Sequence, residues 1–160
     1  MIWQTSSTSS DDTEKLGESL GSYLKGGEVI ELWSDLGGGK TTFVRGLARG
    51  AGSQDRTSSP TFTLSRIYKA KKFDIHHFDF YRLDDAGILK DQLAEAMGDK
   101  NVVVIEWADI VKDVLPNSHI SIQFEPTANS PDERLITISY PENHQGIIKQ
   151  LETARTEERP

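Results

Sequence analysis

The segment from Ser34 to Thr41, SDLGGGKT, has the composition of a phosphate-binding loop. In such a loop, glycines let backbone N–H groups converge on phosphate oxygens at the start of a helix, whose dipole adds a favourable potential. The ammonium group of Lys40 would reach the β- and γ-phosphates, and the Thr41 hydroxyl would bind the Mg²⁺ that bridges them. The segment therefore predicts a site for a nucleoside triphosphate.

The loop departs from the usual pattern G-x-x-x-x-G-K-[ST], because Ser34 stands where the first glycine belongs. If that position requires a positive φ, serine costs about 1 kcal/mol there and weakens nucleotide affinity. The remaining Gly-Lys-Thr is weak evidence alone, and the alternative is a glycine-rich turn with a surface lysine. The flanking residues favour the loop, because Val29–Trp33 has the pattern of a strand and residues 43–48 have helical spacing.

Two carboxylates stand at the ends of apolar runs. Asp79 lies between Phe78 and Phe80, and Glu106 follows the continuous run Val102–Ile105. Carboxylates rarely enter such runs unsupported, and open α/β sheets bind ligands at the carboxyl ends of their strands. We therefore expect Lys40, Asp79 and Glu106 to meet in one crevice as the catalytic residues. The alternative is a pair of strand-end carboxylates that face water or bind a basic residue.

Two further features have both a structural and a functional interpretation. His77 lies two residues before Asp79 and so on the same strand face, although a single histidine is more often structural. The hydroxyl-rich segment Thr57–Thr61 reads as a turn by itself. It follows the loop helix, where many nucleoside triphosphatases keep a segment that senses the γ-phosphate.

The elements that must position these residues give an α/β fold. Residues 1–160 are expected to form a single domain with a three-layer P-loop architecture and a mixed central sheet, and a frayed tail is expected from about residue 152. Helical spacing predicts helices within residues 9–26, 43–50, 84–97 and 147–151, and strands are expected at 29–33, 61–68, 73–80, 102–105, 120–124 and 135–140. The last two strands should pair antiparallel.

The charge and residue composition of the chain argue against some classes of function, such as strong binding of nucleic acids. The chain has 25 acidic and 18 basic residues and a net charge of −7, so its field should repel polyanions. The basic turn containing Lys69, Lys71 and Lys72 is read as solvated and not as an RNA site. Cysteines are absent, and neither a signal peptide nor an apolar run of membrane-spanning length is evident. We expect a soluble cytoplasmic protein with no membrane partner.

Four ordered motifs, SDLGGGKTTFVRG, SSPTFTL, HFDFYRL and VIEWAD, resemble those of the bacterial TsaE family, also called YjeE. The resemblance covers most of the chain. It implies a P-loop ATPase required, with TsaB, TsaD and TsaC, for the threonylcarbamoyl modification of adenosine in tRNA. The partners it implies are the TsaB–TsaD complex and, through that complex, tRNA.

The same resemblance implies roles for individual residues. Mg²⁺ would be held by Thr41 and Glu106, and Asp79 would act near the γ-phosphate or the attacking water. Ser10 would lie near the adenine, and Trp107 and residues 59–61 would be functional. The nucleotide phosphates would be bound by Asp35, Leu36, Gly37, Gly38, Gly39, Lys40, Thr41 and Thr42. Leu93 stands where the family pattern has glycine, which puts in doubt whatever partner contact the segment 84–98 makes.

Two other functions fit the residues alone. A small-molecule kinase would use Asp79 as the base for a substrate hydroxyl, and a nucleotide-dependent binding switch would change shape without needing turnover. The guanine-reading pattern Asn-Lys-x-Asp is absent, which favours ATP. The leading hypothesis is Mg²⁺-dependent ATP hydrolysis, slow without partners and coupled to the TsaB–TsaD complex.

Overall fold

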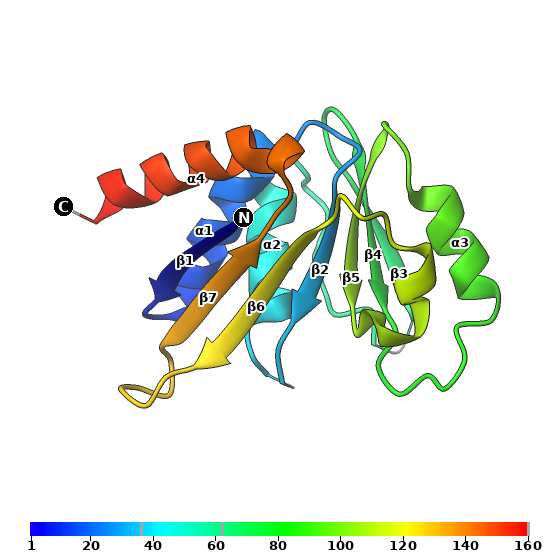
Figure 1. Cartoon of the computed structure of the whole chain (residues 1–160), viewed down its shortest axis with the longest axis horizontal. Coiled ribbons are helices and arrows are strands. Elements are labelled where there is room, and N and C mark those ends of the chain that lie inside the picture. Colours follow the sequence, from blue (N-terminus) through cyan, green and yellow to red (C-terminus); the bar gives the residue numbers. More distant parts are fainter. Residues whose placement is uncertain (36, 62, 160) are drawn as a thin grey trace.

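A mixed sheet with the strand order β1-β7-β6-β2-β5-β4-β3 runs through the molecule (Figure 1). The computed structural model describes residues 1–35, 37–61 and 63–159. Its strands are β1 (Ile2–Ser7), β2 (Val29–Trp33), β3 (Ser65–Lys69), β4 (Asp74–Asp79), β5 (Asn101–Glu106), β6 (Ile120–Pro126) and β7 (Arg134–Ser139). Its helices are α1 (Ser10–Tyr23), α2 (Lys40–Gly50), α3 (Ile88–Ala96) and α4 (Gln145–Glu158), with 3₁₀ helices η1 (Ala108–Val114) and η2 (Glu142–His144).

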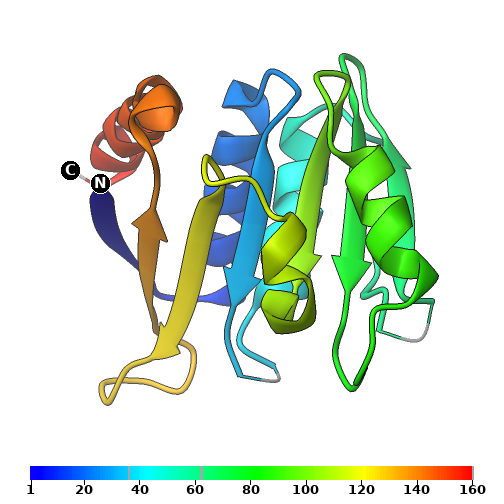
Figure 2. The same ribbon diagram turned by 45° about the vertical axis from the view of Figure 1, so that its right-hand side comes forward.

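The centre of the sheet is parallel. β2 pairs with β5 and β6, and β5 pairs with β4, all in parallel register. Val102–Ile105 of β5 are fully buried because helices cover both faces of the sheet, as the continuous apolar run predicted. The carboxyl ends of β2, β4, β5 and β6 consequently lie along one edge, the lower edge in Figure 2.

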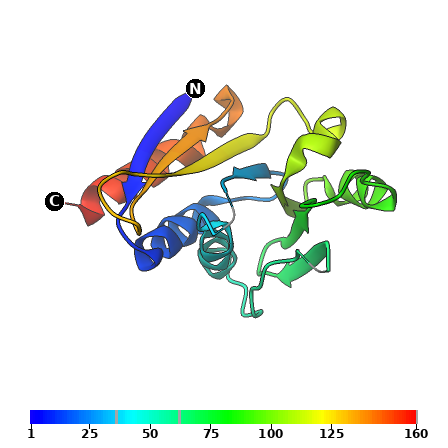
Figure 3. The same ribbon diagram turned by 90° about the horizontal axis from the view of Figure 1, so that it is seen from below.

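Alternate side chains of these strands enter two cores. One core lies between the sheet and α1, α2 and α4, and the other lies beneath α3 and η1 (Figure 3). Val102 and Val104 belong to the first core, and Val103 and Ile105 belong to the second. The two cores give the expected three layers.

Helices α1 and α2 touch through their backbones. A Cβ at Gly46 or Gly50 would lie 1.9 Å from the carbonyl oxygen of Glu14 or Glu18, respectively. A Cβ at Gly17 would lie 2.2 Å from the carbonyl of Phe43, and one at Gly21 would lie 2.1 Å from that of Leu47. Glycine is therefore required on both sides of this contact, where any larger residue would separate the helices.

The two ends of the chain differ from the sequence-based expectation. Strand β1 was not predicted, yet it pairs antiparallel with β7 along its whole length. The frayed tail expected from about residue 152 is wrong, because α4 continues to Glu158. Arg155 is buried and donates to both Asp12 carboxylate oxygens, which fixes these last turns against α1.

Two internal boundaries also move. The strand expected at 61–68 begins at Ser65, because Leu64 N–H turns back to the carbonyl of Pro60 and Leu64 itself has a φ of 66°. The helix expected at 84–97 spans Ile88–Ala96, since Gly87 has a φ of 51°. Among the described residues, no helix is long and apolar enough to cross a bilayer.

Candidate active site

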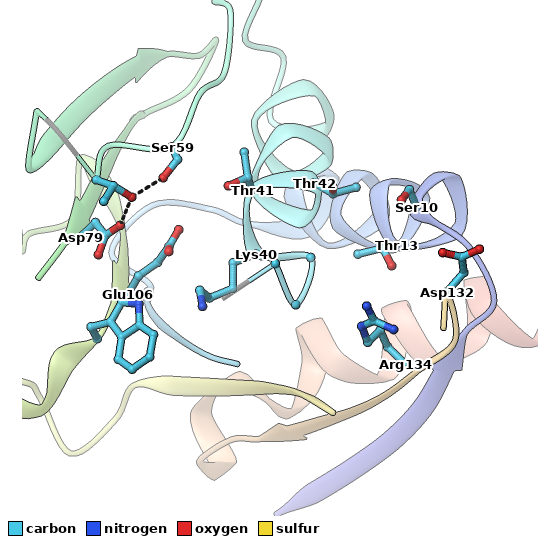
Figure 4. A pocket seen from close by; sticks show the side chains of 15 residues that line it. Ser10, Thr13, Lys40, Thr41, Thr42, Ser59, Asp79, Glu106, Asp132 and Arg134 are labelled. Atoms are coloured by element: carbon cyan, nitrogen blue, oxygen red, sulfur yellow. Dashed lines mark hydrogen bonds between the residues drawn. The ribbon is translucent and has the colours of Figure 1, made fainter. Parts of the chain in front are cut away.

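A pocket of about 280 Å³ opens at the carboxyl edge of the sheet (Figure 4). It is lined by Ser10, Thr13, Gly37, Gly38, Gly39, Lys40, Thr41, Thr42, Ser59, Thr61, Asp79, Glu106, Trp107, Asp132 and Arg134. The structure thus brings together most residues predicted for the site. Asp35 does not line the pocket, although its backbone carbonyl contacts Lys40 Nζ. Leu36 lies outside the described residues.

The N-terminus of α2 faces this pocket. Gly39 is the N-cap residue with a φ of 103°, and no side chain caps the first turn. Gly37 has a φ of 75°, so both glycines adopt left-handed backbone that other residues rarely tolerate. A helix N-terminus without a side-chain cap presents backbone N–H groups and a positive dipole end, which suit an anion.

Lys40 is almost completely buried beside this helix end, with 7% of its surface exposed. Its Nζ donates to the Ser34 carbonyl at 3.0 Å and to Ser34 Oγ at 2.9 Å, with a longer contact of 3.5 Å to the Asp35 carbonyl. Burial lowers the pKa of Lys40, and the charges of Glu106, Asp79 and Asp35 oppose that shift. Nζ also lies 5.0 Å from the ring centroid of Trp107, a cation–π contact.

Ser34 does not carry the strain anticipated for a missing glycine. In the described part of the chain, the residues other than glycine with positive φ are Leu64, Arg82 and Trp107. The predicted cost of about 1 kcal/mol therefore does not arise at Ser34. Instead, its side chain bonds to Lys40 and fills the space above Gly38, where a Cβ would lie 2.4 Å from Ser34 Oγ.

Asp79 and Glu106 are direct neighbours across the parallel pair β4 and β5. Both are nearly buried, with 2% and 3% of their surface exposed. Asp79 Oδ2 accepts from the Thr61 hydroxyl at 2.7 Å, and Oδ1 accepts from the Tyr81 N–H at 2.8 Å. Glu106 Oε1 accepts from His77 Nε2 at 2.8 Å. The two carboxylates are thus held in place by different neighbours.

The donor set fits Mg²⁺ in the presence of a nucleotide. Among the described residues no group of three or more His, Asp or Glu side chains is arranged to hold a metal by itself. Mg²⁺ commonly binds through one or two protein oxygens plus phosphate and water. The Thr41 hydroxyl and the Glu106 carboxylate line the same pocket, and the latter uses Oε1 toward His77, so Oε2 remains for a cation.

Two residues at the far side of the pocket were not predicted. Asp132 and Arg134 flank the start of β7 and face Ser10 and Thr13 of α1 (Figure 4). Asp132 lies between the two strands expected at 120–124 and 135–140, in a segment to which the sequence analysis assigned no function. Because β6 is parallel to β2 and antiparallel to β7, the β6–β7 turn must emerge at the carboxyl edge. That topology is the signal that could have placed both residues here.

The three described non-glycine residues with positive φ lie near site residues in the sequence, and one of them, Trp107, lines the pocket. Leu64 follows Thr61, Arg82 follows the Asp79 strand, and Trp107 follows Glu106 at a φ of 57°. The ring of Trp107 packs on Tyr81 at 4.9 Å between centroids. Left-handed backbone at bulky residues costs free energy and clusters at functional sites.

The sequence of the chain is similar to that of a known protein family. A family model described as "Threonylcarbamoyl adenosine biosynthesis protein TsaE" matches residues 7–136. The chain belongs to the TsaE family. The expected resemblance is thereby confirmed, and the matched region runs from the end of β1 into β7, so it spans the whole pocket.

Individual TsaE proteins agree with this assignment. A "tRNA threonylcarbamoyladenosine biosynthesis protein TsaE" of Bacillus subtilis is 33% identical over 138 residues, 86% of this chain and 84% of the relative. The protein of the same name from Treponema pallidum is 37% identical over 134 residues, 83% of this chain and 97% of the relative. A crystal structure of Bacillus subtilis YdiB covers 97% of each chain with a TM-score of 0.77 and 25% identity. The expected three-layer fold is confirmed.

Proposed function

We propose that this protein binds and hydrolyses ATP with Mg²⁺ and that this activity serves the threonylcarbamoyladenosine modification of tRNA, through the TsaB–TsaD complex. The observation that carries the proposal is the meeting of Lys40, Asp79 and Glu106 at the uncapped start of α2. The names of the relatives support the pathway. The partner complex is the one that the TsaE motifs implied, and tRNA would be reached through it.

The pocket divides by chemistry into a phosphate side and a nucleoside side. On the phosphate side, Gly37–Thr42 supply backbone N–H groups, and the side chain of Lys40 within this segment supplies a positive charge. Ser10, Thr13, Asp132 and Arg134 lie on the other side, where hydroxyl, carboxylate and guanidinium groups can bind the sugar and base. This arrangement supports the predicted placement of Ser10 near the adenine.

Hydrolysis needs an oriented water and stabilisation of charge on the phosphoryl oxygens. Asp79 would orient the water, and its two hydrogen bonds to Thr61 and Tyr81 fix the direction in which the carboxylate points. Lys40 and the N–H groups of α2 would stabilise the developing negative charge. Thr41 and Glu106 would hold Mg²⁺, which neutralises phosphate charge when bound.

The test is steady-state ATPase activity with and without purified TsaB–TsaD complex and tRNA. We expect slow Mg²⁺-dependent hydrolysis that the complex stimulates. Lys40→Ala and Glu106→Ala should each lose Mg²⁺-dependent nucleotide binding or hydrolysis, whereas Asp85→Asn, which changes an exposed carboxylate outside the pocket, should not.

Three results would contradict this proposal. Wild-type rates in Lys40→Ala and Glu106→Ala would overturn the site. Rapid phosphate transfer to a metabolite, without stimulation by TsaB–TsaD, would indicate a small-molecule kinase instead. If Asp79→Ala abolished turnover but still restored modified tRNA in cells lacking the native protein, nucleotide binding alone would act as a switch.

A further inference from the structure

A line of buried polar groups leads away from Glu106 into the sheet. His77 is fully buried, and its Nε2 lies 2.8 Å from Glu106 Oε1. A carboxylate only accepts hydrogen bonds, so Nε2 is the donor. On the other side of the ring, Nδ1 lies 3.4 Å from the hydroxyl oxygen of Tyr68. That hydroxyl donates to the Ser58 carbonyl at 2.8 Å.

The segment at the far end of this line reaches the second carboxylate as well. Ser59, the residue after Ser58, shares a hydrogen bond with the Thr61 hydroxyl, which donates to Asp79. Residues 58–61 therefore touch Asp79 directly and Glu106 through Tyr68 and His77. One short loop is connected to both carboxylates of the pocket.

From this geometry we infer that Tyr68 and His77 are positioning residues that connect the backbone of Ser58 to Glu106. The inference rests on the proposed role of Glu106 as a Mg²⁺ ligand. Through Tyr68 and His77, the position of the loop 58–61 and the orientation of the Glu106 carboxylate would depend on each other.

The weakest contact in this series of polar groups is the one between Tyr68 and His77. A tyrosine hydroxyl has a single hydrogen, and the distances assign it to the Ser58 carbonyl. The contact with His77 is longer than a good hydrogen bond. If the Ser58 carbonyl moves away, the same hydrogen can turn to Nδ1. Movement of the loop thus changes the partner of His77, and His77 in turn holds Glu106.

Packing alone does not explain these side chains. A phenylalanine and a leucine would fill the same space without burying polar atoms, which is costly unless each finds a partner. The adjacent His76 gives the contrast. It points to the opposite face of β4, where it lines a shallow groove with Phe78 and Asn101 and has no route to Glu106.

Three variants separate the two contacts of the imidazole. His77→Asn keeps a polar atom near the position of Nδ1 and removes the donor to Glu106, whereas His77→Gln places an amide nitrogen near the position of Nε2 and loses the atom facing Tyr68. Tyr68→Phe removes only the hydroxyl. His76→Asn is the matched control. Thermal melting of each variant checks that it is folded.

Metal affinity is measured with Mn²⁺ and ADP by electron paramagnetic resonance, without turnover. His77→Asn should bind Mn²⁺ about 10- to 100-fold more weakly, as expected for a lost partner of a metal ligand. His77→Gln, Tyr68→Phe and the control should remain close to wild type. A folded His77→Asn with wild-type Mn²⁺ affinity would overturn the positioning role.

The connection to the loop is measured by hydrogen–deuterium exchange of peptides covering residues 57–64, with ADP and with or without Mg²⁺. In the wild type and in the control, Mg²⁺ should slow exchange of this segment. Tyr68→Phe and His77→Gln should lose that response while still binding metal. Retention of the response in both variants would overturn the connection.

Glu106→Gln distinguishes failure of this inference from failure of the proposed function. If it keeps wild-type Mn²⁺ affinity, Glu106 is not a ligand, and both the metal role proposed for it and the positioning role of His77 are wrong. If Glu106→Gln loses affinity and a folded His77→Asn does not, the metal role of Glu106 stands and only the positioning role is overturned.

Discussion

The side chain of Ser34 is expected to compete with nucleotide for Lys40. An ammonium group has three donors, and in this structure they point to the Ser34 carbonyl, Ser34 Oγ and the Asp35 carbonyl. Phosphate oxygens must take over at least one of these donors. Because a glycine would offer no hydroxyl, the contact with Oγ distinguishes this loop from the usual motif.

Ser34→Ala removes the hydroxyl and leaves the backbone carbonyl in place. A single hydrogen bond contributes a net stability of about 0.5–1.5 kcal/mol, with more when one partner is charged. If the 2.9 Å bond to Ser34 Oγ exists only in the nucleotide-free protein, its removal should tighten ATP binding about twofold to tenfold. Ser34→Gly is the poorer test, since glycine also increases the backbone freedom of the loop itself.

The assay is a titration of Mg²⁺–ATP by calorimetry or with a fluorescent ATP analogue, comparing Ser34→Ala with the wild type. Ser22→Ala serves as control, because Ser22 is exposed on α1 and its hydroxyl bonds only to its own helix, at the Ser19 carbonyl. An unchanged or weaker affinity in Ser34→Ala would refute the reasoning. Ser34 would then hold Lys40 in the orientation that nucleotide binding needs.

Three further predictions concern stability and binding. Gly38→Ala should lower the free energy of unfolding by about 1–3 kcal/mol, since the added Cβ would crowd Ser34. In a double-mutant cycle, Gly38→Ala should cost less stability in the Ser34→Gly background, and strictly additive losses would contradict this explanation. Asp12→Asn should lower the free energy of unfolding by about 1–3 kcal/mol near neutral pH, because buried Arg155 loses a charged partner. Burial alone would raise the pKa of Asp12, but hydrogen bonds, first from Arg155, lower it below 3.8, so this stability is present above that pH and lost below it. Denaturant unfolding at several pH values should therefore show the two proteins converging in acid, and a constant difference would count against the assignment. Nucleotide binding should change tryptophan fluorescence through Trp107, which lies over Lys40; a signal that survives in Trp107→Phe would come from elsewhere.

The centre of the fold was predictable because its sequence signals are local. The run Val102–Ile105 is typical of a strand buried on both faces, and the glycine-rich loop joins a strand to a helix. Once β4 and β5 are parallel, Asp79 and Glu106 must end at the same edge, so the convergence with Lys40 followed from topology. Their roles in binding and catalysis stay predictions.

The missed features depend on contacts between distant residues. Strand β1 pairs its Trp3 with Ile138 of β7, and its own sequence gives little sign of this because Ile2 is exposed. The last turns of α4 depend on the bond from Arg155 to Asp12, which no local pattern reveals. The positive φ considered for Ser34 does not occur, and the sequence could not decide this because the φ of one loop residue is set by the whole loop.

The glycine contact between α1 and α2 has a consequence for how the pocket can move. The pocket residues Ser10 and Thr13 belong to α1, and the pocket residues Lys40, Thr41 and Thr42 belong to α2. Because these helices meet backbone to backbone, they can neither slide nor separate without opening a gap in the core. The side of the pocket formed by α1 and α2 is therefore one rigid unit. The opposite side includes Ser59, Thr61 and Trp107, which lie outside these helices. Under the proposed function, any difference in shape between the ATP-bound and ADP-bound protein should appear on that opposite side, which is the surface that a partner would contact.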